Sequence, residues 1–192
     1  DRVANRLFSS DYNPLYKSGT IAVVLMSLVT VTGLILVFFY RLAEPYESLR
    51  WITDNHLLVG WMRSLHRYAS GAAALAVVLH AFRMFAQGKS WGPRAFSWVT
   101  GLLLLVFLFV SGWTGYVMVW DEHALALVVA GAKMIDATGL LADPISRSFN
   151  GAVDQPPGSF FFLNLFLHVV VPLGMIFGTW IHTSRMARAS WF

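Results

Sequence analysis

Two segments of equal length decide the fold: residues 66–80 read HRYASGAAALAVVLH, and residues 168–182 read HVVVPLGMIFGTWIH. Each segment begins and ends with histidine, and most of the residues between the histidines are apolar or small. Because an α-helix rises about 1.5 Å per residue with 3.6 residues per turn, 14 residues make just under four turns and about 21 Å. Both histidines of a segment are therefore expected on one face of a helix.

Two such helices side by side would form two histidine–histidine clamps about 20 Å apart. An imidazole on each side suits the axial positions of a haem iron and leaves no open position for oxygen. We therefore expect two b-type haems, bound without covalent attachment, that carry electrons across a membrane. Zinc is not expected, because ligands this far apart cannot share one ion. The remaining alternative is a subunit without haem, whose histidines make only polar contacts.

The composition is that of a membrane protein. Of 192 residues, 57% are hydrophobic and only 12% are charged, which is about half the charged fraction of an ordinary soluble domain. Four apolar blocks are each long enough to span a bilayer. We predict an all-α membrane protein that forms one domain over residues 1–192. This domain is a four-helix transmembrane bundle in contact with lipid, with helices over about 17–40, 56–87, 95–120 and 159–188.

The segments between the spans are predicted to lie at the membrane surfaces. Residues 41–55 are expected to be a polar connection, and residues 121–158 a long surface connection with a short helix near 123–132. The chain has no cysteine, which excludes disulfides, covalent c-type haem attachment and iron–sulfur ligation by this chain. Nothing in the sequence indicates a nucleic-acid site.

Charge predicts the orientation in the membrane. The termini and the connection near residue 90 share one side, which carries eight Lys and Arg against two carboxylates, while the other side carries six against eight. The excess of cations places the termini in the cytoplasm, and a prokaryotic inner membrane is the expected location. His66 and His168 then form an outer pair that holds one haem iron, and His80 and His182 form an inner pair that holds the other.

Two glycine pairs repeat the same 14-residue spacing on the other two helices, Gly19 with Gly33 and Gly101 with Gly115. Glycine lets a backbone approach a flat group closely, so these positions are expected to leave room for the haems. The alternative is ordinary packing of small residues between membrane helices. Two pairs that match the histidine spacing favour the haem interpretation.

Several cations lie close to the histidines in sequence. Arg63 and Arg67 flank His66 within a span, where a charge is costly and usually has a partner. Haem propionates are such partners, because arginine binds carboxylates through paired hydrogen bonds. Alternatively, both side chains extend to the membrane interface. His56 and His123 are expected to be interface residues, and the other interpretation is proton acceptance from a bound quinol.

These residues also resemble a known family. The motifs that carry the resemblance are GWMRSLHRYAS (60–70), LHAFR (79–83), PR (93–94), SWVTG (97–101), TGY (114–116) with WD (120–121), and HVVVP (168–172). They are similar to the N-terminal four-helix half of cytochrome b from quinol-oxidising bc- and b6f-type complexes, and most similar to the b6 form. The resemblance implies outer and inner haems at the histidine pairs given above, and propionate contacts at Arg63, Arg67, Arg83 and Arg94.

The resemblance also implies partners. These are a quinone or quinol, an iron–sulfur protein, a c-type cytochrome, or several of these, and a separate subunit that supplies the C-terminal half of cytochrome b. The chain departs from the family at Val119, where the family has proline beside its outer quinol site, and that C-terminal half is not in this sequence. We therefore carry two hypotheses: a cytochrome b subunit of a quinol-linked oxidoreductase complex, or a haem-bearing anchor and electron conduit for a dehydrogenase or hydrogenase.

Overall fold

The computed structural model describes Arg6, Asn13 and residues 15–54, 57–140, 142–149 and 158–184. Its described part is helical, with no strand. Four helices are long and apolar enough to cross a membrane: α2 (Ser18–Val37), α4 (Val59–Ala86), α5 (Ala95–Val117) with the short 3₁₀ turn η1 (Gly92–Arg94) before it, and α7 (Gly158–Ser184). The all-α membrane bundle predicted from the sequence is confirmed.

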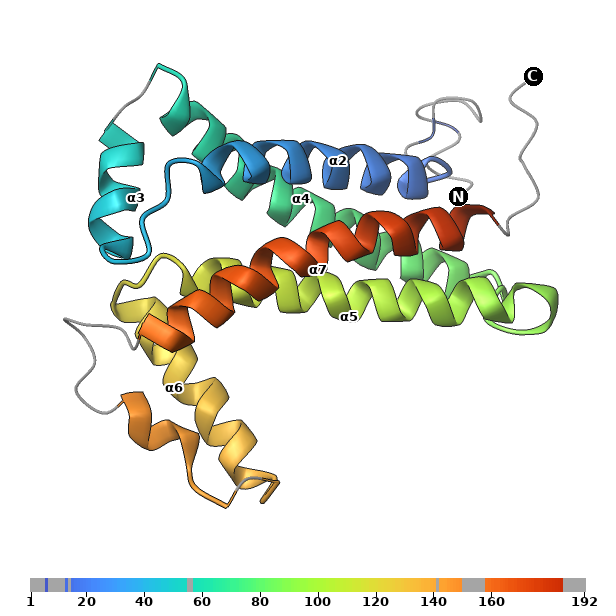
Figure 1. Ribbon diagram of the computed structural model, residues 1–192. Helices are drawn as coiled ribbons and strands as arrows, with labels where there is room; N and C mark the ends of the chain where they lie inside the picture. The colour runs from blue at the N-terminus through green and yellow to red at the C-terminus, as the bar shows by residue number, and fades with distance from the viewer. Residues whose placement is uncertain are drawn as a thin grey trace.

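The four spans form a ring in which each helix packs against two neighbours. Contacts join α2 to α4, α4 to α5, α5 to α7 and α7 back to α2, and the closest pairs are α2 with α4 and α5 with α7 (Figure 1). The two histidine-bearing helices, α4 and α7, lie on a diagonal, and no Cα atom of one comes within 8 Å of a Cα atom of the other. The expectation that these helices lie side by side was wrong, because each of them packs against α2 and α5 instead and faces the other across the ring.

Three shorter helices connect the spans. The segment 41–55, expected to be a polar connection, contains α3 (Pro45–Asp54), and the long connection contains α6 (Glu122–Ala137) and the 3₁₀ helix η2 (Ile145–Phe149). Helix α6 is longer than the short helix expected near 123–132. Both α3 and α6 lie at the end of the bundle opposite to the start of α2 and the end of α7 (Figure 1).

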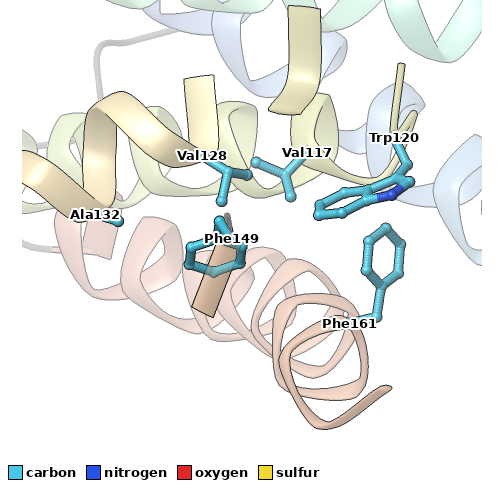
Figure 2. Packing of buried hydrophobic residues seen from close by; sticks show 6 residues of the cluster. All are labelled: Val117, Trp120, Val128, Ala132, Phe149 and Phe161. Carbon is cyan, nitrogen blue, oxygen red and sulfur yellow. The ribbon is translucent and has the colours of Figure 1, made fainter. Parts of the chain in front are cut away.

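A buried apolar cluster joins α6 and η2 to the ends of the spans. It consists of Val117, Trp120, Val128, Ala132, Phe149 and Phe161, which meet between α5, α6, η2 and α7 (Figure 2). The Trp120 and Phe161 rings meet edge to face, with their centroids 4.8 Å apart, a geometry that aromatic rings favour. The cluster fixes the start of α7, and therefore the height of His168 in the bundle.

A partly buried hydrogen bond connects the residues that follow α2 with those that follow α5. The Tyr40 hydroxyl donates to the Met118 carbonyl over 2.8 Å, and burial raises the pKa of this phenol. A carbonyl just beyond a helix end lacks an intrahelical partner, so Tyr40 satisfies a group that would otherwise be exposed or unpaired.

Candidate haem-binding site

Each of the four glycines lies against one of the four histidines. A Cβ atom added to Gly19 would lie 3.0 Å from Cε1 of His80, and one added to Gly33 would lie 3.0 Å from Cε1 of His66; the corresponding distances are 3.1 Å for Gly101 and His182, and 2.5 Å for Gly115 and His168. Real Cβ atoms essentially never come as close as 2.5 Å to a neighbour, and contacts of 3.0–3.1 Å are tighter than nine in ten real ones. Glycine at these positions therefore makes room for an imidazole on the neighbouring helix.

The pairing follows the ring of helices. Helix α2 supports both histidines of α4, and α5 supports both histidines of α7. Gly33 and Gly115 serve the outer pair, and Gly19 and Gly101 serve the inner pair. The two helices without histidine are thus the ones that set where the imidazoles lie.

A hydroxyl residue comes directly before each of these glycines. The side-chain oxygens lie within hydrogen-bond distance of the histidine Nδ1 atoms: Ser18 to His80 at 3.2 Å, Thr32 to His66 at 3.1 Å, Thr100 to His182 at 3.1 Å and Thr114 to His168 at 3.2 Å. Each of the four glycines therefore belongs to a Ser/Thr–Gly dipeptide whose hydroxyl binds the imidazole that the glycine accommodates.

These hydrogen bonds determine where the imidazole proton lies. The hydroxyls of Thr32, Thr100 and Thr114 donate to carbonyls three and four residues earlier in their own helices. Because their one proton is already used, their oxygens accept from Nδ1–H of the histidine. The proton therefore lies on Nδ1 and the lone pair on Nε2, which is the form of histidine that binds a metal.

Backbone carbonyls support the same assignment. His66 Nδ1 donates to the Val29 carbonyl and His168 Nδ1 to the Ser111 carbonyl, each over 3.0 Å, and His182 has a backbone hydrogen bond with Ser97. A carbonyl can only accept, so Nδ1 must carry the proton. Metal-binding histidines almost always donate their other ring nitrogen in this way, which fixes the ring and raises its basicity.

The outer pair has the separation that a shared metal requires. The ring centroids of His66 and His168 lie 6.2 Å apart, which is roughly the sum of two metal–nitrogen bonds of about 2 Å each and the half-widths of two imidazoles. His80 and His182 lie within electrostatic range of each other. No described group of three or more His, Cys, Asp or Glu could hold a metal alone, but a haem iron needs only two protein ligands.

Three cations lie close together near the C-terminal end of α4. Arg83, one turn from His80, donates from Nη1 to the Tyr16 carbonyl over 3.3 Å and stacks on the Tyr16 ring, while its buried Nε has no hydrogen-bond partner. Lys89 and Arg94 lie nearby: partial burial and the positive charges of Arg94 and Arg83 lower the pKa of Lys89. Among the described residues the one ion pair joins Arg41 to Glu44. This cluster has therefore no described carboxylate partner, and it would suit an anionic group.

Arg63 and Arg67, which flank His66, have different surroundings from Arg83. Arg63 is partly buried, and its Nη1 donates to the Thr53 hydroxyl of α3 over 2.8 Å. Arg67 is exposed, as is Arg94 at the inner end. The structure therefore holds Arg63 and Arg83 in place by hydrogen bonds, and leaves Arg67 and Arg94 on the surface.

The departure from the family at Val119 has a local consequence. The Val119 N–H donates to the Tyr116 carbonyl over 3.2 Å, and a proline cannot make this bond because it has no N–H. The next residue, Trp120, has a φ of 52°, a left-handed conformation that is unusual for a bulky residue. The buried Nε1 of Trp120 has no hydrogen-bond partner.

Among the described residues one further histidine, His123, joins neither pair. His123 lies on α6, beside an open groove that is also lined by Tyr116, Ala126, Leu127 and Ala130. His56 lies outside the described residues.

The sequence interpretation missed the hydroxyl residues that bind the histidines. The sequence contains a pattern that could have indicated them, because Ser18, Thr32, Thr100 and Thr114 each precede one of the four glycines. It was overlooked because hydroxyl residues in membrane helices usually bind carbonyls of their own helix, as Thr30 does here.

The fold and the site together define a four-helix membrane protein with two pairs of histidines, each histidine held by a glycine and a hydroxyl residue of a neighbouring helix. The sequence profile of the Cytochrome b/b6/petB family matches residues 3–189. The chain belongs to the cytochrome b/b6 family, and the resemblance inferred from its motifs is confirmed.

Individual proteins support this membership. Cytochrome b6 of Porphyra purpurea is 31% identical over 180 residues, which are 90% of this chain and 81% of that protein. Cytochrome b6 of Synechococcus sp. (strain JA-3-3Ab) is 30% identical over 154 residues, which are 79% and 71% of the two chains. A chain of a hyperthermophilic respiratory complex III shares the fold, with a TM-score of 0.76 at 18% identity, over 89% of this chain and 47% of that one.

Proposed function

We propose that this chain is a dihaem cytochrome b subunit that carries electrons across the membrane within a quinol- or quinone-linked oxidoreductase complex. The outer pair, His66 and His168, would hold one b-type haem, and the inner pair, His80 and His182, would hold the other. The observation that carries the proposal is the hydrogen bonding of Nδ1, which leaves Nε2 of His66, His168 and His182 unprotonated and able to bind a metal.

A bound haem supplies one-electron chemistry at iron, and the chain's own residues do the rest. The carbonyls of Val29 and Ser111 hold the outer imidazoles and raise their basicity. Because α4 and α7 lie diagonally across the ring of helices, a flat group held by their histidines would lie inside the bundle. With one histidine from α4 and one from α7 as ligands, the iron would have no free position for oxygen and would serve electron transfer.

The charged ends would hold the propionates. Arg83, with its unpartnered Nε, and Lys89 and Arg94 would bind those of the inner haem. Arg63 and Arg67 would serve the outer haem, with Arg63 positioned by Thr53. In the membrane we place the chain termini in the cytoplasm of a prokaryotic cell, on the basis of the charge distribution.

The relatives favour a quinol-linked complex over a conduit for a hydrogenase or dehydrogenase, because their names are cytochrome b6 and respiratory complex III. The partners would then be a quinone or quinol, an iron–sulfur protein or a c-type cytochrome, and a separate subunit for the C-terminal half of cytochrome b.

Single histidine substitutions test the assignment of the pairs. In the purified complex, His66→Ala and His168→Ala should each remove the same haem, and His80→Ala and His182→Ala should each remove the other. Reduced-minus-oxidised spectra distinguish the two haems by their bands and potentials. If His66→Ala and His182→Ala remove the same haem, or if none of the four changes the spectrum, the proposal is wrong.

A further inference from the structure

One buried side chain lies midway between the two histidine levels on α7. Met175 is seven residues from His168 and seven from His182, so it shares their helix face and lies about 10 Å along the helix from each. It is 2% exposed, and the other two buried residues of α7, Phe161 and Asn164, come before His168. Met175 is therefore the one buried side chain of α7 between the histidines.

Helix α4 has only a small side chain midway between its two histidines. Ala73 holds the equivalent place on α4, seven residues from His66 and from His80, and it is 1% exposed. Its methyl group fills far less space than a thioether. The long, flexible and polarizable side chain of methionine is suited to fill such an irregular interior.

Met175 is linked to the outer pair through a single residue. The Ser111 hydroxyl donates to Met175 Sδ over 3.9 Å, whereas the hydroxyls of Thr32, Thr100 and Thr114 bond to carbonyls of their own helices. The Ser111 carbonyl accepts from His168 Nδ1 over 3.0 Å. Ser111 thus connects the thioether at the midpoint to the ring of one outer histidine. The inner histidine of α7, His182, is bound by Thr100 and Ser97 instead.

We propose that Ser111 and Met175 are positioning residues that set the reduction potential of the outer haem without changing that of the inner haem. This inference rests on the proposed dihaem function. Met175 holds the Ser111 hydroxyl away from its own helix, and this fixes the Ser111 carbonyl under His168. Donation by His168 to that carbonyl makes its imidazole a more basic ligand and favours oxidised iron. Loosening the link should therefore raise the outer potential.

The test is to measure both potentials in the intact complex by spectroelectrochemistry, for Met175→Leu, Ser111→Ala and the double variant. Met175→Leu is the deciding variant, because it nearly conserves volume and removes no atom that His168 itself binds, so that it acts only by loosening the Ser111 link. We expect the outer potential to become more positive in both single variants while the inner potential stays unchanged. The double variant should shift the outer potential by less than the sum of the single shifts, since the residues act through one link.

Ser27→Ala is the matched control, because the Ser27 hydroxyl bonds only to the Val23 carbonyl of its own helix, and it should change neither potential. An unchanged outer potential in Met175→Leu would overturn the inference, and so would equal shifts of both potentials, which indicate a general change of the interior. Counting haems in the wild-type complex separates the two proposals. Fewer than two haems contradicts the proposed function itself, whereas two haems with no shift contradicts only the role of Ser111 and Met175.

Discussion

Gly115 and His168 are the most tightly packed of the four glycine–histidine pairs, since a Cβ atom at position 115 would lie 2.5 Å from the imidazole Cε1. Gly115→Ala should therefore displace His168 and remove or weaken the outer haem. Overpacking of this kind costs about 1–3 kcal/mol, which exceeds or cancels the gain of about 1 kcal/mol in helix propensity. Haem content and the spectrum of the outer haem measure the effect.

Gly112→Ala is the control on the same helix, because nothing lies within 4 Å of a Cβ atom at that position. It should keep both haems. If Gly115→Ala and Gly112→Ala bind haem equally well, close packing of Gly115 does not matter for His168.

Thr32→Val should weaken the outer haem, because it removes the hydroxyl that accepts from His66 Nδ1 over 3.1 Å. Loss of such a supporting hydrogen bond typically reduces metal affinity about 10–100-fold. Haem retention during dilution or extraction gives the affinity. Thr30→Val makes the same chemical change two residues away on α2, where the hydroxyl bonds only to the Met26 carbonyl, and it should retain haem like the wild type. Equal retention by both variants would mean that the Thr32 hydroxyl is dispensable.

Arg83→Gln should make the inner haem easier to oxidise. The substitution removes a positive charge one turn from His80, together with the Nε group that has no partner in the protein, and a nearby cation stabilises the more negative, reduced state. The inner potential should become more negative while the outer potential stays in place. Arg50→Gln, on exposed α3 at the other end of the bundle, should change neither. If the outer potential shifts instead, the assignment of Arg83 to the inner haem is wrong.

Acid should loosen the contact between α6 and η2. The Asp136 carboxylate accepts from the backbone N–H groups of Ile145 over 2.7 Å and Ser146 over 3.1 Å, and hydrogen bonding to Ser146 lowers its pKa. Since the folded pKa lies below the ordinary value of about 3.9, the stabilisation is complete well above that pH. It declines as the pH falls below it and is lost once the pH passes below the lowered folded pKa.

Hydrogen exchange of the Ile145 and Ser146 amides can follow this change. The protection of these amides should fall in acid in the wild type and in Asp143→Asn, which alters an exposed carboxylate. In Asp136→Asn protection should be lower at neutral pH and should depend less on pH. Wild-type protection that is constant down to pH values well below 3.9 would contradict this role of Asp136.

The sequence predicted the spans and the histidine pairs because both are periodic along one chain. Apolar blocks long enough for a bilayer identify α2, α4, α5 and α7, and the 14-residue spacing places His66 with His80 on one face. Helix α3 was missed because its polar composition and Pro45 were interpreted as a connection. Proline is in fact favoured in the first turn of a helix, and α3 begins at Pro45.

What the sequence could not predict depends on contacts between distant segments. The diagonal placement of α4 and α7 follows from the packing of each of them against both α2 and α5, and no periodicity within one helix determines that. The cluster of Trp120, Phe149 and Phe161 joins three segments separated by long connections. The link from Met175 through Ser111 to His168 spans two helices and 64 positions, so it is visible only once the helices are placed.

The most direct test of the account is to count b-type haems per chain in the purified complex by the pyridine haemochrome method, with both potentials measured on the same sample. We predict two haems with two distinct potentials, one for each histidine pair. One haem would mean that one of the pairs does not bind iron, and none would mean that the hydrogen-bonded histidines serve only the packing of the bundle.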